Sequence, residues 1–159
     1  MQGLTQFTPQ QQRMVMERTN SAARPADARA PGFASNLDYR ITVEPFDGVV
    51  TVSFSSAIIA ASKNAKVLKE TNHPDVFYIP FEDIYFDLLR RSETSSHCPY
   101  KGDASYWNVT AVGEAVPDVM WAYEHPYEEM LAIRDHGAFY PDKVRIETVE
   151  QSETDRPVP

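Results

Sequence analysis

Short apolar runs with a spacing of two residues recur along most of this chain, and this periodicity is the feature that most constrains its fold. In residues 40–44 apolar and polar side chains alternate, and Val50, Val52 and Phe54 then place three apolar groups on one face of a second run. Further runs lie at residues 58–60, 65–68, 76–79, 105–110, 119–123, 138–140 and 144–149. Because turn residues separate these runs, they predict an all-β fold, a compact single domain of short strands.

Helix is expected in only one or two short segments. Residues 127–133 follow a proline and contain good helix formers, so the sequence predicts a short helix there. Residues 80–89 fit two patterns: Ile84, Phe86 and Leu88 suit one face of a strand, whereas Ile84 and Leu88 also suit one face of a helix. We favour a strand for this segment.

The two ends of the chain differ in composition from its middle. Residues 1–35 are rich in Gln, Ala, Pro and Arg, with few of the residues whose burial offsets an ordering cost of about 1–2 kcal/mol per residue. We therefore expect a mostly irregular N-terminal extension at 1–35, a β domain at 36–149 and an acidic tail at 150–159. Within this otherwise irregular extension, a short helix over 10–18 is compatible with the sequence.

Composition excludes several classes of function. The chain has 159 residues, a formal net charge of −8 and one cysteine. Nucleic acid and anionic membranes bind clustered Lys and Arg, so neither is expected as a partner. The lone Cys98 rules out an internal disulfide and a zinc site of several thiolates. No apolar stretch approaches the ~18 residues that span a bilayer, and the first residues are too polar for a signal peptide, so we expect a cytoplasmic protein.

The densest group of chemically distinctive residues begins Cys-Pro-Tyr-Lys-Gly at residue 98. Proline and glycine favour a tight turn, which would aim Cys98 and Lys101 at one spot. On one interpretation Lys101 activates the Cys98 thiol as a nucleophile. On the other, which we favour for a lone cysteine, Cys98 is a small buried residue and Lys101 is exposed on the turn.

Four motifs together resemble the domain of unknown function 427 family. They are the run 70–80 with Asp83 and Ile84, the run 94–107, Trp121-Ala122-Tyr123, and Ala138-Phe139-Tyr140. The resemblance covers about residues 41–149 and implies a compact β fold similar to the Mss4-like, or β-tent, group. That group includes zinc-binding proteins, methionine sulfoxide reductase B and the ligand-binding domain of cereblon. The paired Cys-x-x-Cys motifs of its zinc members are absent from this sequence. The family has also been labelled nucleotidyltransferase-like, but the glycine-rich and paired-aspartate signature of those enzymes is absent too.

Aromatic residues recur in these motifs. If neighbouring strands bring several of them onto one concave face, they wall a small-molecule pocket; the alternative is that about half of them fill the core. The predicted ligand-binding residues are Tyr78, Lys101, Tyr106, Trp107, Trp121, Tyr123 and Tyr140. Among these, we expect Lys101, Trp107 and Trp121 to converge on one cavity.

The candidates for chemistry are Cys98, Lys101 and Glu70. Glu70 and Asp83 are carboxylates that could act as a general base or hold Lys101 in position. His97 lies next to Cys98 and would point to the opposite face of an extended segment, where it is a poor base for the thiol. The histidines lack metal-ligand spacing, and phosphate-binding glycine loops and serine-hydrolase elbows are missing from the sequence, so we expect no metal and no cofactor.

Three functions remain open at this level. The first is the binding of an unidentified small molecule, with Lys101 and Glu70 as polar anchors. The second is an enzyme that uses Cys98 or Lys101 covalently. The third is an interaction module whose N-terminal arm, through Met14 and Met16, docks on a second copy to form a homodimer or on another partner. The sequence leaves open whether the protein is an enzyme.

Overall fold

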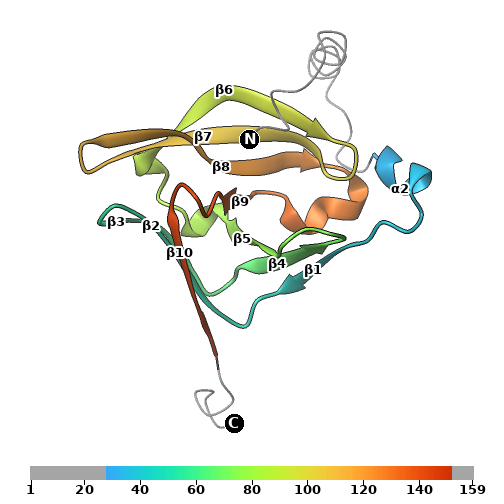
Figure 1. Cartoon of the computed structure of the whole chain (residues 1–159), viewed down its shortest axis with the longest axis horizontal. Helices are drawn as coiled ribbons and strands as arrows, with labels where there is room; N and C mark the ends of the chain where they lie inside the picture. The colour runs from blue at the N-terminus through green and yellow to red at the C-terminus, as the bar shows by residue number, and fades with distance from the viewer. Residues whose placement is uncertain (1–27, 152–159) are drawn as a thin grey trace.

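A computed structural model describes residues 28–151 as ten strands in two antiparallel sheets (Figure 1). The larger sheet contains, in spatial order, β1 (Ile41–Pro45), β4 (Lys66–Glu70), β5 (Val76–Pro80), β9 (His136–Phe139), β8 (Glu114–Pro126), β7 (Gly102–Ala111) and β6 (Leu89–Cys98). The smaller sheet contains β10 (Arg145–Glu150), β2 (Gly48–Phe54) and β3 (Ala57–Ser62). The all-β prediction is confirmed.

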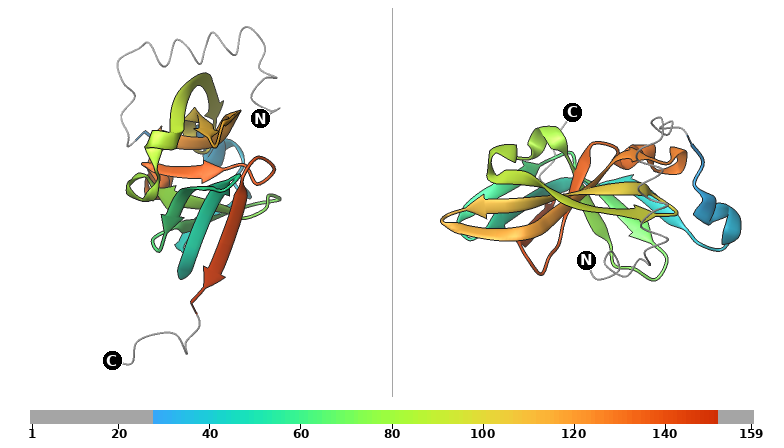
Figure 2. Two further views of the ribbon diagram at one scale, coloured as in Figure 1. Left: turned by 90° about the vertical axis from the view of Figure 1, so that its left-hand side faces the viewer. Right: turned by 90° about the horizontal axis from the view of Figure 1, so that it is seen from above.

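The seven-stranded sheet has two differently packed faces. One face packs against the three-stranded sheet, and there Val50, Val52 and Phe54 share a buried cluster with Met120, as their spacing predicts. The opposite face carries a second cluster that includes Tyr78, Tyr106 and Tyr123. In the left view of Figure 2, β2 and β10 extend away below the long strands. Because successive residues of a strand point to opposite sides, neighbours on β7 and β8 belong to different clusters.

Helical turns in the described residues are short. They are α2 (Pro31–Ser35) and the 3-10 turns η2 (Phe81–Asp83), η3 (Phe86–Leu88) and η4 (Glu128–Ile133). The helix predicted at 127–133 is confirmed by η4. The strand favoured for 80–89 is wrong. These residues carry the chain from β5, inside the sheet, to β6 at its edge, and they fold into two turns that pack Phe81 and Phe86 on Trp107 at centroid distances of 6.0 and 6.1 Å.

The segment before β1 packs against the turn between β6 and β7. Gly32 N donates a hydrogen bond to the carbonyl of Pro99 at 3.0 Å, and the Phe33 ring meets Tyr100 edge-on at 5.0 Å. The end of the predicted extension, α2 included, is therefore ordered against the domain. The helix expected over 10–18, with Met14 and Met16, lies outside the described residues, as does the tail after residue 151.

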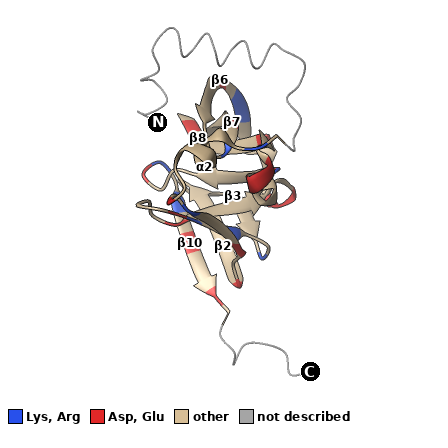
Figure 3. Cartoon of the chain, turned by 90° about the vertical axis from the view of Figure 1, so that its right-hand side faces the viewer, with Lys and Arg blue, Asp and Glu red and all other residues tan. Residues whose placement is uncertain are grey.

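Charge is distributed over several elements. In the view of Figure 3, Lys and Arg segments interleave with Asp and Glu segments on the strands and loops.

As far as residues 28–151 are concerned, every helix is too short or too polar to cross a bilayer.

Candidate functional site

The Cys-Pro-Tyr-Lys-Gly motif forms the hairpin between β6 and β7 and, as predicted, makes a tight turn. The Lys101 amide donates to the carbonyl of Cys98 at 3.3 Å. Gly102 follows at a φ of 112°, a conformation that an L side chain rarely adopts. The turn brings the Lys101 Nζ to 4.0 Å from the Cys98 Sγ. The two groups therefore do meet at one spot.

Lys101 forms an ion pair with Glu70 at the end of β4. Its Nζ donates to Glu70 Oε1 at 2.7 Å, and the two side chains are 9% and 11% exposed. The favoured interpretation of Lys101 as an exposed turn residue is thus wrong, because the hairpin folds its side chain inward to meet β4. The Tyr39 hydroxyl donates to the other oxygen of Glu70. Burial, and then this hydrogen bond, raise the pKa of Tyr39.

A cavity of about 560 Å³ opens beside this ion pair. The predicted ligand-binding residues that line it are Tyr78, Lys101, Tyr106, Trp121, Tyr123 and Tyr140. The catalytic candidates Cys98 and Glu70 line it as well. These residues come from β4 to β8, from the β6–β7 turn and, for Tyr140, from the position directly after β9, so several strands and connections contribute to one space on the face opposite the small sheet.

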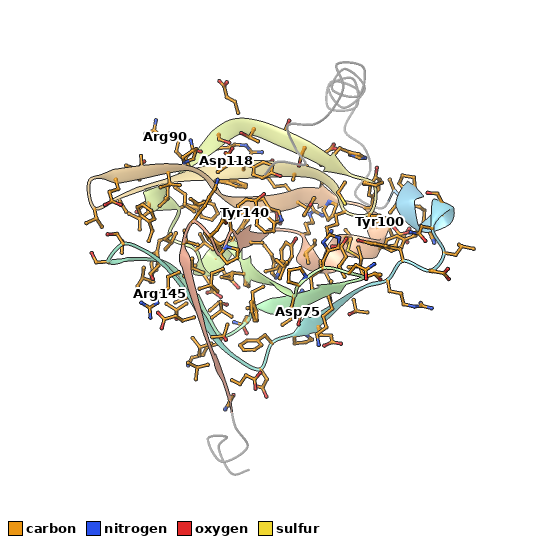
Figure 4. The ribbon with its side chains drawn as sticks, in the orientation of Figure 1. Asp75, Arg90, Tyr100, Asp118, Tyr140 and Arg145 are labelled. Atoms are coloured by element: carbon orange, nitrogen blue, oxygen red, sulfur yellow. The ribbon has the colours of Figure 1, made fainter. Side chains whose placement is uncertain are left out.

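Aromatic rings form a large part of the cavity wall, seven of its fifteen residues. Trp121 lies 4.5 Å from Tyr140 between ring centroids, and its Nε1 donates to the hydroxyl of Tyr78 at 3.2 Å. Tyr39 stacks on Tyr100 at 4.2 Å with an interplanar angle of 20°. Figure 4 labels Tyr140 in the interior of the molecule and Tyr100 beside α2. The rings therefore line the space from its interior to the end of the sheet next to α2.

The phenol groups of the wall differ in their partners. The Tyr106 hydroxyl is 2.9 Å from Ser96 Oγ, and a second hydrogen bond joins it to Tyr140. In the part of the chain that the structure describes, no group hydrogen-bonds to the hydroxyl of Tyr123, which is 8% exposed. Burial raises the pKa of Tyr78, Tyr123 and Tyr140, so these hydroxyls keep their protons at neutral pH.

Trp107 does not line the cavity, so the expected convergence of Lys101, Trp107 and Trp121 is wrong. Trp107 follows Tyr106 on β7 and must point to the opposite face of the strand. It lies in the core between the sheets, 6% exposed, with the Arg91 guanidinium 5.1 Å from its ring centroid. Trp107 therefore packs in the core and contributes nothing to the cavity wall.

Other candidates lie elsewhere. Asp83 accepts a hydrogen bond from Ser62 at 2.6 Å and does not hold Lys101. His97 is 2.5 Å from Asp103 through its Nδ1 and is not among the residues that line the cavity. Within residues 28–151, no three His, Cys, Asp or Glu side chains are placed to hold a metal ion.

Comparison with known proteins gives a family. Residues 42–150 match the family described as domain of unknown function (DUF427). The chain belongs to this family. No curated protein matches the sequence. The DUF427 match contains the ion pair and nearly the whole cavity wall, whereas Tyr39 precedes it. Similarity to the Mss4-like fold stays a prediction.

The predicted set leaves out seven residues that line the cavity: Tyr39, Leu68, His73, Pro74, Val76, Pro99 and Tyr100. Tyr100 belongs to the Cys-Pro-Tyr-Lys-Gly turn, so the motif itself was a signal for it. His73 closely follows Glu70 in the run 70–80. Tyr39 lies outside every motif and reaches the cavity only because the segment before β1 folds back over the turn.

Proposed function

We propose that this DUF427 domain binds a planar small molecule in the cavity beside Lys101 and Glu70. The observation that carries the proposal is a wall of aromatic rings around a buried ion pair. The volume of about 560 Å³ lies within the ~300–1,000 Å³ typical of ligand sites. The faces of Trp121 and Tyr140 favour a flat ligand, because aromatic rings attract one another in offset-stacked and edge-to-face arrangements.

The ion pair supports a binding role because of its place in the fold. Burying two charges costs several kcal/mol per ion in lost hydration, and apolar side chains of similar size often stabilise a fold as well or better. Lys101 and Glu70 nevertheless lie at the wall of the cavity. Fixed polar groups on an apolar wall orient a ligand, which is the role proposed for this pair.

Two matched variants test the proposal, because the chain has two tryptophans on opposite faces of the sheet. Trp121→Phe replaces an indole of the cavity wall by the smaller phenyl ring, and Trp107→Phe makes the same replacement in the core. A set of neutral, cationic and anionic planar fragments is titrated while the two indole N–H signals are followed by NMR, with each signal assigned from its variant.

The expected result is a saturable shift of the Trp121 signal with little change at Trp107. Because Trp121→Phe lacks the reporting indole, affinities for the native protein and both variants are measured by isothermal titration calorimetry. Binding should weaken at least fivefold in Trp121→Phe and stay within twofold in Trp107→Phe. If no planar fragment shifts the Trp121 signal, or if both variants bind equally well, the proposal is wrong.

A second candidate function, covalent chemistry at Cys98, is favoured by one contact. The Lys101 Nζ lies 4.0 Å from the Cys98 Sγ, and a cation beside a thiol can activate it as a nucleophile. The test is the rate of alkylation by iodoacetamide across pH in the native protein and in Lys101→Met, with Cys98→Ser as the blank. If both proteins react with the rate and pH profile of an ordinary thiol, Cys98 is not an activated nucleophile.

A further inference from the structure

The Tyr123 hydroxyl is a buried donor without a protein partner. Among the described residues nothing accepts its hydrogen bond or donates to it, although the residue is only 8% exposed. Tyr123 lines the cavity, and its charge interactions are with other groups of the same cavity, Tyr78 first. An unsatisfied buried hydroxyl is costly, and native proteins avoid it unless the group has another use.

Tyr78 presents a second unused proton to the same space. Its hydroxyl oxygen accepts the hydrogen bond from Trp121 Nε1 at 3.2 Å, and no acceptor for its own proton is found in the part of the chain that the structure describes. Tyr78 is 1% exposed. Because burial raises the pKa of both phenols, each remains a neutral donor at physiological pH.

The carboxylate of the inner cavity and the hydroxyl of Tyr106 already have hydrogen-bond partners. Glu70 Oε1 accepts from Lys101 and its Oε2 accepts from Tyr39. Tyr106 is bonded to Ser96 and Tyr140. The exposed His73 lies where solvent reaches it. Among the described residues, the inner wall therefore offers the protons of Tyr123 and Tyr78 as unused donors, and its open acceptors are neutral phenol oxygens such as those of Tyr123 and Tyr140.

Formal charge is balanced in this wall. The ammonium of Lys101 is compensated by the carboxylate of Glu70 at 2.7 Å. A charged ligand would bring a charge into an apolar space without a free countercharge, at a high cost in lost hydration. A neutral ligand avoids this cost.

We infer that the cavity selects neutral planar compounds that carry an acceptor oxygen, such as an aryl ketone, held by the hydroxyls of Tyr123 and Tyr78. This inference rests on the proposed function and adds the chemical class of the ligand. The ring of such a compound lies against Trp121, and its carbonyl oxygen accepts the hydrogen bonds that the wall leaves unmade.

Three probes of the same shape test the class. 2-Acetylnaphthalene is neutral with an acceptor oxygen, 2-isopropenylnaphthalene replaces that oxygen by a methylene group, and 2-naphthoate is anionic. Each is titrated into the full chain while the Trp121 indole signal is followed. The proteins are the native chain, Tyr123→Phe, and Tyr85→Phe as the control, because Tyr85 is exposed and lies outside the cavity lining.

The native protein should bind the ketone at least about fivefold more tightly than either other probe, the ratio expected for one hydrogen bond. In Tyr123→Phe this preference should fall to within about twofold, with binding of the isopropenyl probe unchanged. Tyr85→Phe should keep the preference for the ketone. Thermal denaturation should give Tyr123→Phe a Tm equal to or above the native value, because no native contact is lost.

Two kinds of failure are distinguishable. If the isopropenyl probe or the naphthoate binds as tightly as the ketone, or if Tyr123→Phe keeps the full preference, the inference is overturned while the proposed function stands. If none of the three probes shifts the Trp121 signal, the inference is overturned, and the proposed function falls with it only if the wider set of planar fragments also leaves that signal unchanged.

Discussion

Removal of the Lys101 charge tests how strongly the ion pair of the cavity stabilises the fold. Lys101→Met keeps the length of the side chain and leaves Glu70 Oε1 without its partner at 2.7 Å. Loss of one partner costs about 3–5 kcal/mol for a fully buried pair, and an exposed pair contributes less than about 1 kcal/mol. The side chains are 9% and 11% exposed, and Glu70 keeps its hydrogen bond from Tyr39. We therefore expect a loss of about 2 kcal/mol in the free energy of unfolding.

A double-mutant cycle separates this charge effect from general disruption. Glu70→Gln alone should also cost about 2 kcal/mol, because it leaves the buried ammonium uncompensated. The double variant should cost about 2 kcal/mol rather than the sum, which gives a coupling of about 2 kcal/mol between the two side chains. Urea denaturation at pH 7, followed by tryptophan fluorescence, measures all four proteins.

The chain offers a matched control for this cycle. Lys69 and Glu44 form a pair at 3.9 Å whose side chains are 52% and 58% exposed, and its cycle should show coupling near zero. The reasoning is refuted if the Lys101 and Glu70 effects add within about 0.5 kcal/mol, or if the exposed pair couples as strongly.

Three further outcomes are expected. Trp107→Ala should cost about 3–5 kcal/mol in unfolding free energy, and Trp121→Ala clearly less, because Trp107 fills the core and Trp121 is half-buried at the cavity; equal losses of Tm would contradict this placement. Gly102→Ala should cost about 1–3 kcal/mol in urea denaturation, because its φ of 112° disfavours a side chain; an unchanged midpoint would remove this account of the turn. Burial alone would raise the pKa of Glu124, but hydrogen bonds from Arg91 and Ser105 lower it overall. A carboxyl with a lowered folded pKa stabilises the fold above its unfolded pKa and loses that contribution as the pH falls through the folded value. Glu124→Gln should therefore flatten the acid side of the stability profile, and an unaltered profile would argue against the contact with Arg91.

The strands could be predicted because their information is local. Alternation at Val50, Val52 and Phe54 needs only the pleat of one strand and a buried face, and the structure places all three in the core between the sheets. The turn at Cys98–Lys101 was readable for the same reason, since proline and glycine restrict backbone angles without reference to the rest of the fold.

The sequence indicated that Tyr106 and Trp107 do not both line one cavity, but not which of them does. Tyr106 and Trp107 are adjacent in a predicted strand, so only one of them could face a given side. Choosing between them required knowing which side carries the small sheet, and strand pairing decides that. The polar neighbours of Trp107 did not distinguish the two faces.

Long-range contacts explain what the sequence left out. The segment 80–89 carries the chain between two distant strands of one sheet, and this path forces turns on residues whose own pattern suits a strand. Tyr39 meets Glu70 across 31 positions of sequence. Neither the turns in 80–89 nor the contact between Tyr39 and Glu70 produces a periodic pattern of apolar residues from which it could be predicted.

The contribution of Tyr39 bears on how this cavity should be compared with others of its kind. Tyr39 precedes the residues matched to DUF427, which begin at residue 42. A fragment cut to those residues would keep nearly all of both sheets, yet it would uncover the face of Tyr100 and open Glu70 Oε2 to water. Ligand preferences measured on such a fragment would describe a wider and more polar site, with a charged acceptor that the longer chain keeps occupied.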